Sequence, residues 1–216
     1  MIKQLKLGFG MMRYTFGVKM CLVLGIIFFA IGIVMEFLAP PASVSGAMFL
    51  MVCGMWPAQL VYSLGVSDVI KTSKHAKAME TSIPTLICFV TFLVCYIIIV
   101  LFKLPHLSGA TEEMMGYMVS ELMMSSILAA VLMFFCGIAY KLFILASIIF
   151  LVAFCSLTTI SEFGTMLSPD ISFGTAVIVG FAIVVAGALL QYGVSLLVYK
   201  VPLSKKAQLR GLQKYM

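Results

Sequence analysis

The chain has 216 residues, of which 63% are hydrophobic and 10% charged, and its mean hydropathy is +1.18. A soluble domain carries about 25% charged residues because its surface must be hydrated, so this composition excludes a water-soluble globule. The net charge of +6 does not indicate a nucleic-acid partner, because the basic residues lie at the ends of apolar blocks without clustered base-stacking aromatic residues. The composition predicts an integral protein of the lipid bilayer.

Apolar blocks of about 20 residues recur along the chain, and an α-helix of this length crosses a hydrocarbon core about 30 Å thick. The alternating ten-residue segments of outer-membrane barrels do not occur in the sequence. We therefore expect an all-α integral membrane protein with one transmembrane domain over residues 1–216. Its six predicted spans are residues 20–38, 46–64, 85–102, 120–140, 142–160 and 174–199.

The charges between the spans predict the orientation. Residues 1–19 mix basic with aromatic and aliphatic residues, which predicts an interfacial amphipathic helix on the inner leaflet or, alternatively, a basic flank that orients the first span. If both termini are cytoplasmic, thirteen of the fourteen Lys and Arg residues lie inside, including those of segment 65–84 and of the basic tail 200–216, and Lys103 alone lies outside. Lys and Arg near span ends favour the cytoplasmic side, so we expect this orientation in the cytoplasmic membrane.

The sequence contains no motif of a catalytic or cofactor site. The patterns GxSxG, HExxH and GxxxxGK[ST] are all absent. The two histidines, His75 and His106, are predicted on opposite sides of the membrane, which disfavours a histidine metal site. The six cysteines lie in apolar blocks without a CxxC pair, as expected for thiols that pack as small hydrophobic groups. We expect neither an enzyme nor a cofactor-binding protein, and any ATP hydrolysis would belong to a partner subunit.

A few polar side chains within or beside the spans are candidates for a translocation path. Glu36 and Glu121 lie near the predicted outer ends of the first and fourth spans, where they would either reach interfacial water or line an outer vestibule. Gln59 and Gln191 lie inside the second and sixth spans, where they would either line a polar path or form interhelical hydrogen bonds. Lys141 lies in the short turn between the fourth and fifth spans and is expected to act as an orientation determinant.

The longest polar interruption is segment 65–84, between the second and third predicted spans. At helical spacing, one face of this segment carries Val66, Val69 and Ile70, while Asp68 and Lys71 lie on the other. This pattern predicts either a short amphipathic helix at the membrane surface or a solvated loop with helical tendency.

The arrangement of a basic amphipathic head, six spans, both ends inside and a charged segment between spans two and three resembles the membrane subunits of type-2 ATP-binding-cassette exporters. The stretch SLGVSDVIKTSKHAKAMETSIPT, Ser63 to Thr85, is similar to the corresponding segment of small permeases of Gram-positive bacteria. The resemblance implies that this segment is a coupling helix that docks on a separate P-loop ATPase subunit. Its implied docking face consists of Asp68, Lys71, Lys74, His75 and Lys77.

The resemblance also implies two permease copies, as a homodimer or a pseudo-symmetric heterodimer, with two ATPase partners. A peptide, drug or lipid-like substrate would pass between the copies. The chain departs from the family pattern at Ser161 to Phe173, which is too short for the re-entrant helices expected before the last span. Two alternatives stay open: the substrate-binding membrane component of an energy-coupling-factor vitamin importer, and a non-transporting accessory or immunity membrane protein.

Overall fold

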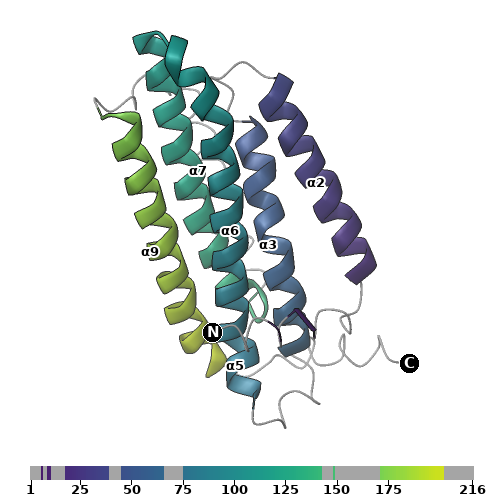
Figure 1. Cartoon of the computed structure of the whole chain (residues 1–216). Helices are drawn as coiled ribbons and strands as arrows, with labels where there is room; N and C mark the ends of the chain where they lie inside the picture. The colour runs from purple at the N-terminus through teal and green to yellow at the C-terminus, as the bar shows by residue number, and fades with distance from the viewer. Residues whose placement is uncertain are drawn as a thin grey trace.

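The computed structural model describes residues 18–38, 45–65, 75–142 and 171–201, together with the isolated positions Lys6, Phe9, Gly10 and Ile148. Within these ranges every regular element is helical. The elements are α2 (Val18–Leu38), α3 (Ser45–Gly65), α5 (Ala76–Glu80), α6 (Ser82–Lys103), the 3-10 helix η1 (Leu104–Gly109), α7 (Glu112–Ala139) and α9 (Phe173–Tyr199). Figure 1 shows the long helices side by side in one bundle.

Four stretches of the described chain are long and apolar enough to cross a membrane. They are Cys21–Leu38, Ala76–Gly109, Glu112–Ala139 and Phe173–Tyr199, and α3 contributes a shorter apolar stretch, Gly46–Tyr62. Large apolar side chains also cover the outside of the bundle: Ile26 and Phe37 of α2 are 67% and 80% exposed, and Leu189 of α9 is 68% exposed. Soluble proteins rarely expose continuous apolar faces of this kind, so the fold is that of a multi-pass membrane protein.

The bundle has two ends that matter for the site. We call the end where α6 finishes the Lys103 end, and the opposite end, where α7 finishes, the Lys141 end. α2 and α3 run antiparallel, since Glu36 lies against Gly46 while Gly25 lies against Cys53. The Lys103 end is uppermost in Figure 1, and the short helix α5 lies at the lower, Lys141 end.

α7 and α9 run parallel and in close contact. A Cβ atom added at Gly187 of α9 would lie 2.8 Å from the Cα of Ala130, and one added at Gly137 of α7 would lie 3.2 Å from the carbonyl oxygen of Gln191. Glycine at these two positions therefore permits the close approach of the helices, as small residues do in membrane bundles. Because α7 ends at the Lys141 end and α9 begins at the Lys103 end, these two helices are not a simple hairpin (Figure 1).

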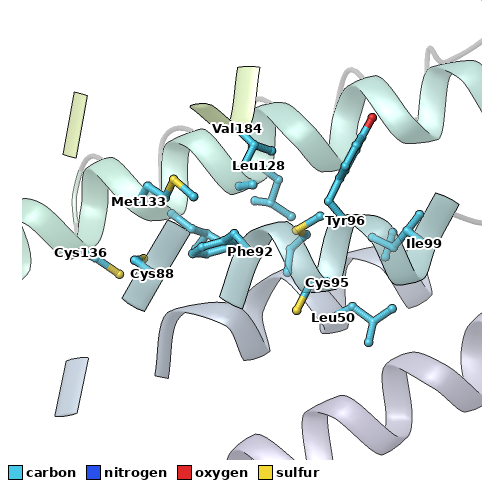
Figure 2. Close-up of a cluster of buried hydrophobic side chains, with 14 of the residues drawn as sticks. Leu50, Cys88, Phe92, Cys95, Tyr96, Ile99, Leu128, Met133, Cys136 and Val184 are labelled. Carbon is cyan, nitrogen blue, oxygen red and sulfur yellow. The ribbon is translucent and has the colours of Figure 1, made fainter. Parts of the chain in front are cut away.

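The core of the bundle lies where α3, α6, α7 and α9 meet. Figure 2 shows α6 side chains packed against those of α7 and α9, with Leu50 of α3 at the edge of the cluster. Cys88, Cys95 and Cys136 are buried thiols in this core, as the sequence predicts. Gly54 of α3 lies against α6, whose Thr91 hydroxyl donates to the Gly54 carbonyl oxygen at 2.7 Å.

Two helices extend beyond the predicted spans. α6 begins at Ser82 rather than residue 85, and α7 begins at Glu112 rather than residue 120. The Thr111 side chain caps α7 by accepting a hydrogen bond from the Met114 amide at 3.3 Å, and Glu112 and Glu113 lie in the first turn, where carboxylates favour the helix dipole. The segment predicted to connect spans three and four is therefore largely helical. Most of the predicted span 142–160, of the predicted interfacial helix, of the 161–173 connection and of the basic tail lies outside the described residues.

Candidate functional site

The short helix α5 is held to the bundle by one of its faces. Ala76, Met79 and Glu80 are buried, and α5 contacts α3, α6 and α9. The Met79 side chain packs in an apolar cluster with Leu60 of α3 and Ile83 of α6. Burying a methionine stabilises the packed state by about 1.5–3 kcal/mol, which is large for a helix of five residues. α5 is therefore attached to several bundle helices at once.

The opposite side of α5 faces outward at the Lys141 end. His75 and Lys77 are exposed there, and both belong to the docking face implied by the resemblance. The other three members of that face, Asp68, Lys71 and Lys74, lie outside the described residues. The residues on which the amphipathic pattern was predicted, Val66, Val69 and Ile70 against Asp68 and Lys71, lie outside the described residues.

A buried ion pair connects α5 to the ends of α7 and α9. The Lys141 Nζ lies 2.9 Å from Glu80 Oε2, and the side chains of Lys141 and Glu80 are only 5% and 3% exposed. The same ammonium group donates to the carbonyl oxygens of Val198, Tyr199 and Val201 at 3.2, 3.0 and 3.3 Å. A cation at a helix C-terminus is favoured by the helix dipole, so Lys141 joins the C-terminus of α9 to α5.

Two tyrosines surround this ion pair. The Lys141 Nζ lies 5.4 Å from the ring centroids of both Tyr140 and Tyr199. The Tyr140 ring stacks on Tyr62 of α3 with a centroid distance of 4.6 Å. Lys141, predicted as an orientation determinant, is thus also a structural contact between elements.

A polar network crosses the interior between α3, α7 and α9. The hydroxyls of Tyr62 and Ser195 share a hydrogen bond of 2.7 Å, and Gln191 Nε2 donates to the Tyr62 hydroxyl at 3.2 Å. Gln59 Nε2 reaches Cys136 Sγ of α7 at 3.5 Å. Gln59 and Gln191 were predicted either to line a polar path or to form interhelical hydrogen bonds. In the structure both form interhelical hydrogen bonds, which join the bundle helices across its core.

At the Lys103 end, three ionisable side chains from three helices meet. The Lys103 Nζ of α6 lies 3.0 Å from Glu36 Oε2 of α2 and 2.7 Å from Glu121 Oε2 of α7. The Lys103 side chain is 4% exposed and each carboxylate side chain 1% exposed. A Cβ atom added at Gly46 would lie 2.7 Å from Glu36 Oε1, so glycine here leaves the room that the carboxylate occupies. We call these three residues the Lys103 triad.

The triad corrects one expectation. The sequence interpretation that Glu36 and Glu121 reach interfacial water is wrong for the described conformation, because Lys103 lies between them and the neighbouring helices enclose all three side chains. Each carboxylate gains a charge-assisted contact instead of hydration, and this arrangement compensates for part of the large desolvation penalty. The four candidate path residues thus separate into two groups, with Glu36 and Glu121 in the triad and Gln59 and Gln191 in the polar network.

Within the described ranges, no group of three or more His, Cys, Asp and Glu side chains is arranged to hold a metal ion. His75 precedes α5 at the Lys141 end, and His106 lies on η1 beyond the Lys103 end of α6. The two histidines are therefore far apart along the bundle (Figure 1). Comparison of the chain with models of protein families, with curated proteins and with solved structures gives no match.

Proposed function

We propose that the chain is the permease subunit of an ATP-driven exporter that works with a separate P-loop ATPase subunit. The observation that carries this proposal is α5, a short helix between α3 and α6 whose buried face joins three bundle helices while His75 and Lys77 are exposed. A partner that binds the exposed side can move the bundle helices through the buried side. The resemblance of segment 63–85 to exporter permeases supports the same role.

The described topology supports six spans in this proposal. α7 ends at the Lys141 end and α9 begins at the Lys103 end, so the chain must pass from one end to the other between them. The apolar block 142–160 is long enough to provide this crossing. We propose that both termini and α5 are cytoplasmic, because nearly all Lys and Arg residues then lie inside. In this orientation the Lys103 end is extracellular.

The transported substrate in this proposal is a peptide, drug or lipid-like molecule that passes between two permease copies, as a homodimer or a pseudo-symmetric heterodimer. The internal contacts of the candidate path residues support a route between copies rather than through one chain. Glu36, Glu121 and Gln191 are buried inside the bundle, and Gln59 bonds to a neighbouring helix. The apolar exposed faces of α2 and α9 are available to lipid or to a second copy.

Reversing the basic charges of the docking face is expected to uncouple the ATPase. The triple variant Lys71→Glu, Lys74→Glu and Lys77→Glu should weaken ATPase binding by about tenfold or more, because like charges opposed across an interface are strongly unfavourable. Its unfolding temperature should stay near that of the wild type, since Lys77 is exposed. The matched control is Lys200→Glu, an exposed lysine at the same end of the bundle. Normal complex assembly and normal stimulated ATPase activity in the triple variant would contradict the docking proposal.

The orientation is tested by cysteine labelling in intact cells. Ser108→Cys on η1 and Lys77→Cys on α5 both replace exposed residues, one beyond each end of the bundle. We expect a membrane-impermeant maleimide to label position 108 from outside and position 77 only after permeabilisation, with the wild-type chain as the blank. The reverse pattern would overturn the proposed orientation.

The direct test of the function is purification of the tagged chain from native membranes in mild detergent, followed by mass spectrometry of the proteins that co-purify. A stoichiometric P-loop ATPase would support the exporter proposal. A clean oligomer without an ATPase, obtained at native expression, would contradict it and favour the accessory membrane protein.

A further inference from the structure

The charges of the Lys103 triad do not balance. Glu36 and Glu121 carry two negative charges when ionised, and Lys103 supplies one positive charge between them. All three side chains are at most 4% exposed, so water cannot screen the remaining negative charge. The Oε1 atoms of both carboxylates are buried without a hydrogen-bond partner among the described residues. An uncompensated charge in such surroundings is far less stable than a neutral carboxylic acid.

Among the described residues, no other lysine or arginine lies at the Lys103 end. Lys103 is the only Lys or Arg between residues 78 and 140, and none lies in residues 20–70 or 142–199. Lys19, Lys77, Lys141 and Lys200 lie at the Lys141 end, at the start of α2, on α5 and just after α7 and α9. The segments that connect to the Lys103 end outside the described residues, 39–44 and 143–170, contain no Lys, Arg or His and add only Glu162 and Asp170.

The remaining titratable groups near this end do not compensate for the charge either. His106 of η1 and Glu112 and Glu113 of α7 are exposed, so water hydrates them. The first turns of α3 and α9 carry no charged side chain. Nothing else among the described residues balances this charge. A proton is the cation that two neighbouring carboxylates take up most readily, since like-charged carboxylates at one site favour protonation of one of them.

We propose that Glu36, Lys103 and Glu121 form a proton-binding site in which the two carboxylates share one proton, and that release of this proton loosens α2 from α6 and α7. With the proton bound, the triad is neutral and joins the three helices. Without it, Glu36 of α2 and Glu121 of α7 repel each other while Lys103 can neutralise only one of them. α2 packs mainly against α3 and has few contacts with α6 and α7, so the triad is a large part of what joins it to those two helices.

This inference goes beyond the proposed function and does not require an ATPase partner. It is tested on the full-length chain in lipid nanodiscs by infrared spectroscopy of the carbonyl stretch of protonated carboxylic acids and by thermal unfolding. With the shared proton bound, the folded chain holds one proton more than the unfolded chain, so the unfolding temperature should fall as the pH rises through the range in which the triad loses this proton. The infrared band should be lost over the same range.

The isosteric variants Glu36→Gln and Glu121→Gln each make the triad neutral without a proton. We expect each variant to lose the infrared band. We also expect its unfolding temperature to fall less steeply with rising pH than that of the wild type. The control Glu113→Gln alters an exposed carboxylate on α7 and should retain both signals. Persistence of the band or of the full pH dependence in either triad variant would overturn the proposal. A stabilisation that requires Na⁺, and is absent when choline replaces it, would also overturn it by showing that a metal cation provides the balance.

Discussion

Replacing Lys103 with methionine is expected to lower the free energy of unfolding by about 3–5 kcal/mol, because the substitution leaves two buried carboxylates without their cation. Methionine retains most of the length of the lysine side chain, so loss of charge rather than loss of packing dominates the effect. The measurement is denaturant or thermal unfolding of the purified chain in a mild detergent. The control Lys77→Met removes an exposed ammonium group from α5 and should change stability by less than about 1 kcal/mol.

A combined variant separates the charge effect from a simple steric defect. Lys103→Met in a chain that also carries Glu36→Gln and Glu121→Gln contains no charge at the triad, so much of the lost stability should return. Replacing buried ion pairs by neutral groups of similar volume is often close to neutral in energy. A triple variant that is as unstable as Lys103→Met alone would show that the ionic contacts of the triad are not what joins α2, α6 and α7.

Replacing Lys141 with methionine should have a similarly large effect at the other end of the bundle. The substitution removes the partner of Glu80 and the donor to three carbonyl oxygens at the C-terminus of α9. Leaving the buried Glu80 carboxylate unpaired is expected to lower the free energy of unfolding by about 3–5 kcal/mol. Lys200→Met, which alters an exposed lysine next to the same helix terminus, is the matched control.

A double-mutant cycle with Glu80→Gln measures how strongly Lys141 and Glu80 are coupled. Residues in one buried ion pair show interaction free energies of about 0.5–3 kcal/mol, so the double variant should be more stable than the sum of the two single effects predicts. Additive effects would contradict a direct contact between α5 and the end of α7. Under the proposed function, Glu80→Gln should also reduce the ATPase stimulation, because it weakens the attachment of α5 to α7 and α9.

The sequence predicted much of the fold because lipid imposes a strong and local requirement. A helix that crosses a bilayer must form all its backbone hydrogen bonds within itself, and it must present apolar side chains over a fixed length. For this reason hydropathy alone located α2, α3, α6, α7 and α9. It underestimated the length of α7, since the Thr111 cap and the acidic first turn, which follow from helix-terminus chemistry, extend this helix beyond its apolar block.

The candidate site was predicted in part. A short helix was one of the two structures predicted for segment 65–84, and α5 is a short helix in its described part, as follows from helical spacing, which is a local property. The partners of Glu80 and Lys141 do not follow from it, because hydropathy gives the depth of a residue in the membrane but not its neighbours. A usable signal did exist at the Lys103 end: Glu36, Lys103 and Glu121 are predicted at similar depth with opposite charges, and Lys103 is the single exception to the basic-inside pattern.

The sequence by itself therefore determined the class of protein and the location of its apolar helices, because each depends on composition and spacing along one stretch of chain. Only the tertiary structure decided which helices are neighbours, and with them the Lys103 triad, the Glu80–Lys141 pair and the hydrogen bond between Tyr62 and Ser195. The physical reason is that apolar helices of this kind can pack in many arrangements of similar hydrophobic energy. Close contacts at glycines and a few buried polar groups select one arrangement among them.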